Sequence, residues 1–320
     1  MNLVPWRAVA VFLVIAFGLA WLLALPLWLS GEGLGTWGGL AVPILGAAIM
    51  LTPSIAALVA CLAIERPRRG ERLHALGVSS RVSLGRLIGY LALGIVVPVA
   101  LILVALPIGA ALGLYEADFE GLSGFRTLVD AQLEAVGAGP LPTPIEALVA
   151  LQFAQVLVGV GVNLAPALGE ELGWRGWLLP RLRRLGAVPA ILLSGVIWGL
   201  WHAPLVLLGY NYPDAPGWLA LVCMVGMCIV VGGVFGWLRL RGGSVWPAAV
   251  AHAAFNAAAG FHIVFGREGA LVDTTSATIL GWSGWIVPLV LVVVLLTTGG
   301  FRLVEPPVRR AAAVAAPAAS

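Results

Sequence analysis

One uncharged stretch decides the fold class: residues 147–169 read ALVALQFAQVLVGVGVNLAPALG, and Glu170 and Glu171 follow it directly. A spanning helix needs about 20 apolar residues, so this stretch is long enough to cross a bilayer. The whole chain has a similar character, with 61% hydrophobic residues, 10% charged residues and a mean hydropathy of +1.02. These values exclude a soluble globular protein, and we expect an integral membrane protein.

Seven other uncharged runs have a comparable length, and all eight hold at least 23 residues. The eight runs are Ala8 to Gly31, Gly33 to Ile64, Leu87 to Tyr115, Ala147 to Gly169, Leu185 to Pro213, Ala215 to Leu238, Gly242 to Gly266, and Thr274 to Phe301. They predict an all-α, polytopic membrane helix bundle with about eight transmembrane helices. We expect residues 1–310 to form a single integral membrane domain, and the Ala-rich segment 311–320 to be a disordered tail.

The basic residues are all Arg, and their distribution predicts the orientation of the bundle. With eight spans, 16 of the 18 Arg lie on the side of both termini, whereas Arg126 and Arg267 lie on the other side with ten of the 15 acidic residues. Cytoplasmic loops collect positive charge, so we expect both termini to be cytoplasmic. Arg without Lys is typical of a high-GC bacterium, and we expect a multi-pass protein of the inner (plasma) membrane.

The basic loops also indicate the partners of the chain. The densest Arg clusters lie in residues 66–86 and 181–184. We expect them to contact anionic membrane lipids, and since no nucleic-acid motif accompanies them, nucleic acid is not an expected partner. On the other side, apolar residues from Leu122 to Leu133 recur at helical spacing, which fits either a helix in the membrane interface or a plain surface loop.

The carboxylates Glu170 and Glu171 are the first candidate functional residues, because an ionisable residue inside a span is costly and marks a functional site by default. Glu171 and Arg175 are four positions apart on one helical face and are expected to form an ion pair. Glu170 is turned about 100° away, which leaves it as the chemically available carboxylate. The alternative is a solvated, inert acidic pair at the end of a helix, since residues 181–184 offer another place for the span to end.

Two histidines in later runs complete the candidate site. His202 shares a helical face with Trp198, and His252 shares one with Asn256. Counted along their helices, Glu170 and His252 are expected at depths of roughly 16 Å and roughly 14 Å, near the midplane of a core of about 30 Å. The same count puts His202 about 24 Å deep, which is too far outward to meet them unless its helix tilts or starts later, as Pro189 would permit.

In their order and spacing, these motifs resemble those of the CPBP family of intramembrane proteases, which includes CAAX prenyl endopeptidases and bacteriocin-processing or self-immunity proteins. The resemblance is carried by Glu170-Glu171-x-x-x-Arg175, Trp198-x-x-x-His202 and His252-x-x-x-Asn256, within a protease core at residues 147–262. Trp198 departs from the family, which more often has Phe, and the change is expected to alter packing before chemistry.

The resemblance implies an intramembrane endopeptidase that acts on a membrane-associated or lipidated peptide or protein. Glu170 and His202 would activate a water, with Glu170 as general base, and His252 and Asn256 would stabilise the oxyanion. Glu171 and Arg175 would orient Glu170. Hydrolysis at depth would also need a water-reachable cavity, which we expect to open toward the cytoplasm.

Metal dependence and two other functions remain open from the sequence. We expect no required metal, and the alternative is a Zn²⁺ ion held by Glu170, His202 and His252 with water as the fourth ligand. The buried charges could instead form the proton or ion relay of a transporter. A third possibility is a catalytically inactive scaffold or immunity protein, although a scaffold needs neither histidine nor Asn256.

Overall fold

The computed structural model describes residues 3–80, 82–139 and 143–302. Those residues form helices and loops without a β-strand, so the predicted all-α class is confirmed. The α-helices are α1 (Trp6–Leu29), α2 (Ala41–Met50), α3 (Thr52–Val59), α4 (Arg72–Ala75), α5 (Leu84–Ala111), α6 (Ser123–Ala135), α7 (Ile145–Glu171), α8 (Leu179–Leu182), α9 (Ala187–Trp201), α10 (Ala203–Val206), α11 (Gly217–Gly242), α12 (Trp246–Ala258), α13 (Phe261–Val264) and α14 (Ile286–Thr297). Short 3₁₀ turns are η1 (Gly33–Gly39), η3 (Arg69–Glu71), η5 (Arg183–Leu185) and η6 (Trp282–Trp285), and π-helical turns are η2 (Ala60–Glu65) and η4 (Leu172–Leu178).

Five helical stretches within the described residues are long and apolar enough to cross a membrane. They are Trp6–Leu29, Ala41–Glu65, Leu84–Ala111, Ile145–Leu185 and Gly217–Gly242. Each falls on one of the predicted runs. The structure therefore confirms a polytopic helical protein with five candidate spans, and the predicted number of eight is not confirmed.

The other three predicted runs contain shorter helices. α9 has 15 residues and stops shortly before Pro204, α12 has 13 and begins beside Pro247, and α14 has 12. A helix of 13 to 15 residues rises only about 20 Å, less than the hydrocarbon core of about 30 Å. Proline interrupts helical hydrogen bonding, and such breaks are tolerated in a bilayer where the backbone lines a cavity.

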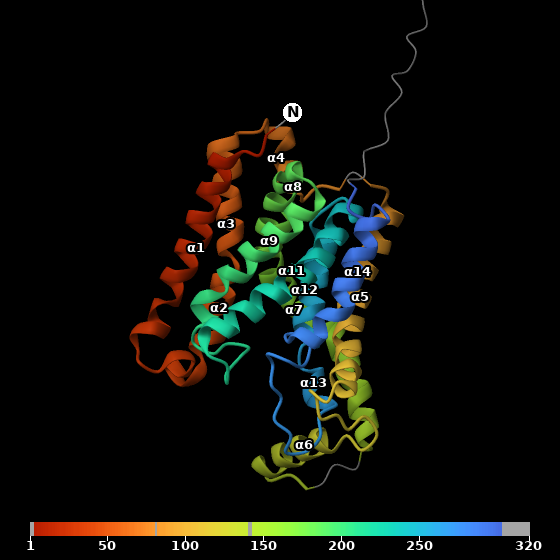
Figure 1. Ribbon diagram of the computed structural model, residues 1–320. Helices are drawn as coiled ribbons and strands as arrows, with labels where there is room; N and C mark the ends of the chain where they lie inside the picture. Colours follow the sequence, from red (N-terminus) through yellow and green to blue (C-terminus); the bar gives the residue numbers. More distant parts are fainter. Residues whose placement is uncertain (1–2, 81, 140–142, 303–320) are drawn as a thin grey trace, which may run out of the picture.

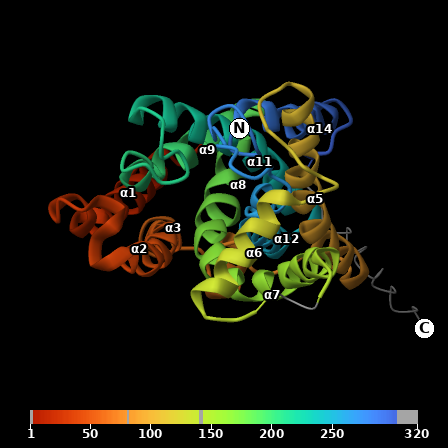
Figure 2. The ribbon, with the colours of Figure 1, turned by 90° about the horizontal axis from the view of Figure 1, so that it is seen from below.

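The helices pack as one bundle around α12. α12 lies against α5, α7 and α11, while α9 lies against α11 and α1 against α2 and α3. Figures 1 and 2 show α1 to α3 on one side of the bundle and α5, α12 and α14 on the other, with α8 and α9 between them. The functional core is therefore built from helices that are far apart in the sequence.

Small residues bring α9 and α11 into close contact. A Cβ at Gly195 would lie 2.5 Å from Ile229 Cα, and a Cβ at Gly199 would lie 2.5 Å from Val225 Cα. Two glycines one helical turn apart are a common device for close helix packing in membranes, because they let two backbones approach. This contact fixes the position of Trp198 and His202 at the end of α9.

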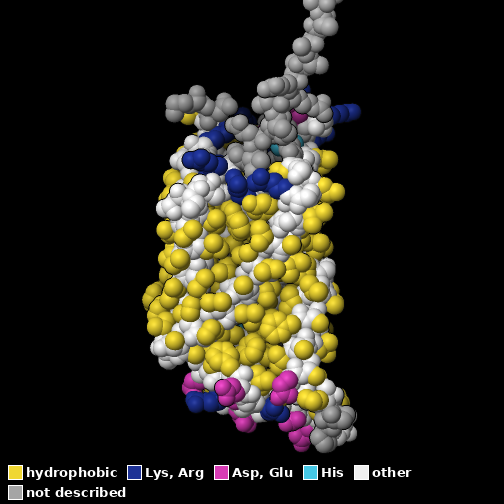
Figure 3. All heavy atoms as spheres, turned by 90° about the vertical axis from the view of Figure 1, so that its right-hand side faces the viewer, with side chains coloured by type: hydrophobic (Ala, Val, Ile, Leu, Met, Phe, Trp, Pro, Cys, Tyr) yellow, Lys and Arg dark blue, Asp and Glu magenta, His cyan; other side chains and the backbone are white. Residues whose placement is uncertain are grey.

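The surface carries its charges at the two ends of an apolar belt. Figure 3 shows Arg side chains at one end, which we call the Arg-rich rim, and most of the Asp and Glu side chains at the other, which we call the acidic rim. α1 begins and α14 ends at the Arg-rich rim, in agreement with an even number of crossings between them (Figure 1). The predicted tail at residues 311–320 lies outside the described residues.

The connection at the acidic rim contains a helix, which is one of the two alternatives that the apolar spacing left open. α6 covers Ser123–Ala135 and buries Phe125, and Figure 1 shows it across the end of the bundle. Asp118 holds the preceding turn by accepting backbone hydrogen bonds from Gly121 (2.7 Å) and Ser123 (3.1 Å). Hydrogen bonding from the Ser123 side chain, and from the Ser123 and Gly121 backbone N–H groups, lowers the pKa of the Asp118 carboxyl.

Candidate functional site

Glu170 and His202 lie at one depth because they occupy equal arms of a helical hairpin. The helix that begins with α7 continues through η4, α8 and η5 to Leu185, and Gly186 turns the chain with φ 106° into α9. Each side chain is therefore about 22 Å along its helix from the turn. The depth of His202, which the sequence left open, follows from the first arm: it runs on to Leu185, so Glu170 lies as far from the turn as His202 does.

His252 reaches the same region because α12 starts below the Arg-rich rim. The Val245 N–H donates to the Gly77 carbonyl (2.8 Å), and Ser244 and Val245 are fully buried. A Cβ at Gly77 would lie 3.0 Å from Gly176 Cα, so this turn is packed beside the middle of η4. α12 thus needs fewer than two turns to bring His252 alongside Glu170.

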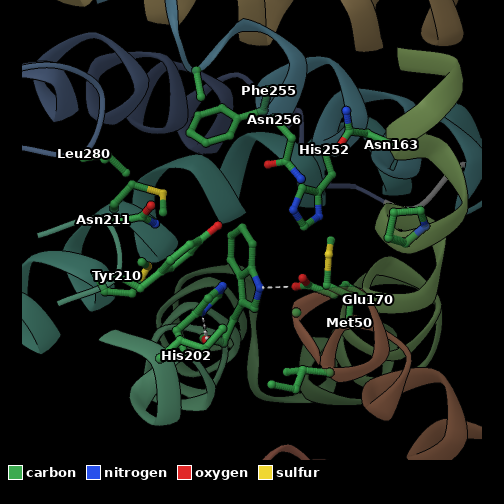
Figure 4. Close-up of a pocket in the computed structure, with 18 of the residues that line it drawn as sticks. Met50, Asn163, Glu170, His202, Tyr210, Asn211, His252, Phe255, Asn256 and Leu280 are labelled. Atoms are coloured by element: carbon green, nitrogen blue, oxygen red, sulfur yellow. Dashed lines mark hydrogen bonds between the residues drawn. The ribbon is translucent and has the colours of Figure 1, made fainter. Parts of the chain in front are cut away.

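A cavity of about 520 Å³ collects the predicted catalytic residues from three separate parts of the bundle. Glu170, His202, His252 and Asn256 all line it, together with Trp198 (Figure 4). The supporting residues Glu171 and Arg175 do not line it and are buried behind it. The inert alternative, a solvated acidic pair at a helix end, is contradicted by the burial of both carboxylates.

Trp198 has a larger role in this site than the sequence indicated. Its indole Nε1–H donates to Glu170 Oε2 over 2.8 Å, and both side chains are only 2% exposed. The guanidinium of Arg175 stacks 4.0 Å from the Trp198 ring centroid, close enough for a cation–π interaction. Phe at this position would pack similarly but could not donate the hydrogen bond.

Behind the cavity, the Glu171 carboxylate accepts hydrogen bonds from two side chains, Arg175 and His252. Its Oε1 accepts from Arg175 Nη1 (2.7 Å) and from His252 Nδ1 (3.0 Å). The predicted Glu171–Arg175 ion pair is confirmed. The contact to His252 was not predicted, since the sequence places these residues 81 positions apart.

The hydrogen bonds of the two histidines fix which ring nitrogen faces the cavity. His202 Nδ1 lies 2.8 Å from the Trp198 carbonyl oxygen, which can only accept, so Nδ1 carries the proton. By the same reasoning His252 Nδ1 donates to the Glu171 carboxylate. Each ring therefore turns Nε2 toward the cavity, which Figure 4 shows between the two histidines and Glu170.

Several further polar residues that the sequence reasoning missed line the same cavity. They include Asn163, Tyr210 and Asn211. Asn163 precedes Glu170 by seven residues, or two helical turns, and this spacing inside an uncharged run was a usable signal. Tyr210 and Asn211 follow the end of α10, and only the tertiary structure brings them to Glu170.

The cavity extends toward the acidic rim. Its exposed members include Tyr210 and Ala259, and its half-buried members include His262, all on segments that lead away from the Arg-rich rim. The expectation of a cavity open on the side of the Arg clusters is therefore wrong. The physical reason is that the segment after Glu170 packs tightly, with Trp174 and Trp177 fully buried.

The geometry does not favour a metal bound by the residues proposed for zinc. Within the described residues, no group of three or more His, Cys, Asp or Glu side chains is close enough together to hold a metal ion. The set Glu170, His202 and His252 thus does not form a ligand cluster.

Comparison with known proteins gives two matches. The family model of Type II CAAX prenyl endopeptidase Rce1-like proteins matches residues 152–258, a range that contains all seven candidate site residues. A protein from Methanococcus maripaludis named CAAX prenyl protease 2 is 42% identical over 50 residues, which make up 15% of this chain and 18% of that protein. The match covers less than a fifth of the length of that relative. The two matches confirm the family resemblance that the motifs indicated.

Proposed function

We propose that this chain, whose residues 152–258 belong to the Rce1-like CAAX prenyl endopeptidase family, is an intramembrane endopeptidase. Its substrate is a membrane-associated or lipidated peptide or protein, and it acts in the plasma membrane, in contact with anionic lipid. The observation that carries the proposal is that one cavity is lined by Glu170, His202, His252 and Asn256. A carboxylate, two imidazoles and an amide are the groups that water-mediated peptide hydrolysis uses.

In this mechanism Glu170 and His202 bind and activate a water. Trp198 holds Glu170 Oε2 at 2.8 Å, which leaves the other oxygen to take a proton from the water. His202 Nε2 accepts a hydrogen bond from the same water. The water oxygen attacks the carbonyl carbon, and the proton held by Glu170 passes to the leaving nitrogen as the C–N bond breaks.

His252 and Asn256 stabilise the negative charge that develops on the carbonyl oxygen. The Asn256 side-chain amide is a donor, and His252 Nε2 is a donor when the ring is cationic. Glu171 supports that state, since its carboxylate lies 3.0 Å from His252 Nδ1. Arg175 shares the same carboxylate oxygen and holds it in place over 2.7 Å.

The proposed reaction needs no metal. The chain supplies the base, the oxyanion donors and the cavity that they line. Metal analysis of the purified protein and activity after chelation test this part. Stoichiometric zinc together with lost activity on chelation would contradict it.

Comparative proteomics of membranes tests the proposed function. Cells carrying Glu170→Gln are expected to accumulate an uncleaved precursor, because an amide cannot act as a base, and the rate is expected to fall about 10²–10⁴-fold. The measurement is the ratio of precursor to product peptides in membranes of mutant and wild-type cells.

The matched control is Glu32→Gln, the same change at an exposed carboxylate far from the cavity. It is expected to leave the ratio of precursor to product unchanged. Unchanged peptides in Glu170→Gln cells, with normal amounts of the variant in the membrane, would contradict the protease. A loss of solute flux in the same cells would then favour the transporter.

A further inference from the structure

We propose that the site takes its substrate from the non-cytoplasmic face of the membrane. The substrate is then a membrane-anchored polypeptide whose scissile segment lies outside the cytoplasm. The inference rests on the proposed function for its substrate, but the direction of access stands on the geometry of the cavity and on the charge of the two rims. Four observations carry it.

The first observation is the direction in which the cavity lining runs along the helices. On α7 the lining residues run from Glu170 back to Asn163, and on α12 they run from His252 forward to Ala259. α7 and α12 are antiparallel in the bundle, and in both cases the lining leads from the catalytic group toward the acidic rim (Figure 1). The catalytic groups are thus the floor of the cavity.

The second observation is where the lining becomes exposed. Tyr210 is 37% exposed, Ala259 is exposed as well, and His262 is half-buried. Tyr210 follows α10, and His262 lies on α13, close to the acidic rim (Figure 1). The mouth of the cavity is therefore at this end of the molecule.

The third observation is the packed layer between the cavity floor and the Arg-rich rim. Trp174, Trp177 and Leu178 are fully buried, and Leu179 and Leu182 are at most 2% exposed. Phe12 stacks on the Trp177 ring with centroids 5.0 Å apart. Between Glu170 and the rim, about 16 Å of helix has no room for a peptide or a water channel.

The fourth observation is the charge of the two rims. Arg side chains gather on one rim, and most Asp and Glu side chains gather on the other (Figure 3). The positive-inside rule makes the Arg-rich rim cytoplasmic. The mouth at the acidic rim then faces the opposite side of the membrane.

The shape of the mouth also indicates how an anchored substrate reaches it. Pro43 and Ala47 of α2 line the cavity and are exposed on the apolar flank of the bundle. A lipid chain or an apolar anchor can lie against α2 while the polar segment beside it enters from the acidic rim. Neighbouring acidic side chains, such as Asp214 and Asp273, favour a segment that carries basic residues.

Thiol labelling in intact cells tests the direction of access. Three single-site variants carry the reporters: Thr127→Cys on α6, Ala259→Cys at the mouth and Gly70→Cys at the Arg-rich rim, all at exposed positions. The native Cys61, Cys223 and Cys228 are at most 5% exposed, so the parent chain is the background control. A membrane-impermeant maleimide is added to spheroplasts of an expressing bacterium before or after permeabilisation.

The expected result is that Thr127→Cys and Ala259→Cys react in intact spheroplasts, whereas Gly70→Cys reacts only after permeabilisation. The reverse pattern would overturn the orientation. Labelling of Ala259→Cys only after permeabilisation, with Thr127→Cys labelled from outside, would overturn the direction of the mouth. If Ala259→Cys is lost from the membrane, Tyr210→Cys replaces it as the reporter of the mouth.

Labelling does not depend on proteolysis, so the experiment can contradict the direction of access without contradicting the proposed protease function. Adding Glu170→Gln to each reporter is expected to leave the labelling pattern unchanged. If precursors then accumulate in Glu170→Gln cells, the cleavage sites are expected on the non-cytoplasmic side of each substrate's anchor. Cleavage sites on the cytoplasmic side would overturn the inference while leaving the protease in place.

Discussion

At the scale of single residues, the hydrogen bond from Trp198 to Glu170 is the most informative contact. It connects the proposed base to the helix that carries His202, over 2.8 Å in a site almost without exposed surface. A hydrogen bond to a charged group contributes about 1.5–3 kcal/mol. Trp198 is therefore a positioning residue, and the departure from the family's Phe has a chemical consequence.

Trp198→Phe is expected to lower kcat about tenfold to a hundredfold with little change in KM, since it removes the bond to Glu170 and keeps the aromatic packing. Steady-state cleavage of an identified substrate measures both constants. Trp201→Phe is the control, because the Trp201 indole donates to Thr52 (3.2 Å) in the same cavity wall and not to Glu170. Equal losses in the two variants would show that the indoles serve packing alone.

The second prediction at the scale of single residues concerns the contribution of the buried Glu171 carboxylate to stability. Glu171→Gln leaves the guanidinium of Arg175, which is 1% exposed, without a carboxylate, and breaking a buried pair costs about 3–5 kcal/mol. We expect a clear fall in the melting temperature of the detergent-solubilised protein. Glu146→Gln is the control, since its pair with Arg126 is 67% and 49% exposed and contributes about 0–1 kcal/mol.

The double variant Glu171→Gln, Arg175→Met separates charge from packing. It removes the unpaired cation and is expected to regain part of the lost stability, as replacement of a whole buried pair often costs little. A melting temperature of Glu171→Gln equal to that of Glu146→Gln would show that the pair contributes nothing to the fold.

At the scale of helices, the hairpin from α7 to α9 is what brings the base and His202 together. Its first arm contains the π-helical turn η4. Two glycines in this turn allow close packing, because a Cβ at Gly173 would collide with Pro53 and a Cβ at Gly176 would collide with the Leu76 backbone. π-helical turns occur mostly at functional sites, because they shift side chains around the helix. Here the turn follows Glu170 and Glu171 and contains Arg175, the partner of Glu171.

The contact between α9 and α11 gives the prediction at this scale. Gly199→Ala would put a Cβ 2.5 Å from Val225 Cα, so α9 must move away from α11 and displace Trp198 and His202. We expect a loss of about 1–3 kcal/mol in stability and a larger relative loss of cleavage. Both are measured on the purified variant, by thermal unfolding and by a cleavage assay.

Gly89→Ala is the matched control for this change. Gly89 lies in α5, and a Cβ there would meet nothing within 4 Å. Alanine favours a helix over glycine, so the control is expected to be neutral or slightly stabilising. If Gly199→Ala behaves like Gly89→Ala, close packing of α9 on α11 does not set the geometry of the site.

At the scale of the whole molecule, the Arg-rich rim predicts a dependence on anionic lipid. Each Arg near a negatively charged membrane surface contributes about 1 kcal/mol. The protein is therefore expected to melt at a higher temperature in phosphatidylglycerol nanodiscs than in phosphatidylcholine nanodiscs, and the difference should shrink in high salt. Arg68→Gln with Arg69→Gln should reduce the difference, whereas Arg126→Gln at the acidic rim should not.

Much of this architecture could be predicted from the sequence, because a bilayer leaves few choices to an apolar chain. Each of the eight uncharged runs predicted a helix, and the structure has a helix in each of them. The spacing of Glu171 and Arg175 predicted their ion pair, which the structure also has. The number of full spans could not be predicted in the same way. Helices such as α9 end early where a proline follows and a cavity lies beside them, and composition does not show which side of a helix faces a cavity.

Local spacing thus determined the fold class, the candidate catalytic residues and the charge of each rim, since these depend on residues within a few turns of one helix. Only the tertiary structure decided that Trp198 bonds Glu170, that His252 bonds Glu171, and that the cavity opens away from the Arg-rich rim. Those contacts join residues 28 and 81 positions apart. They are set by how closely α7, α9 and α12 pack, and no local pattern encodes that distance.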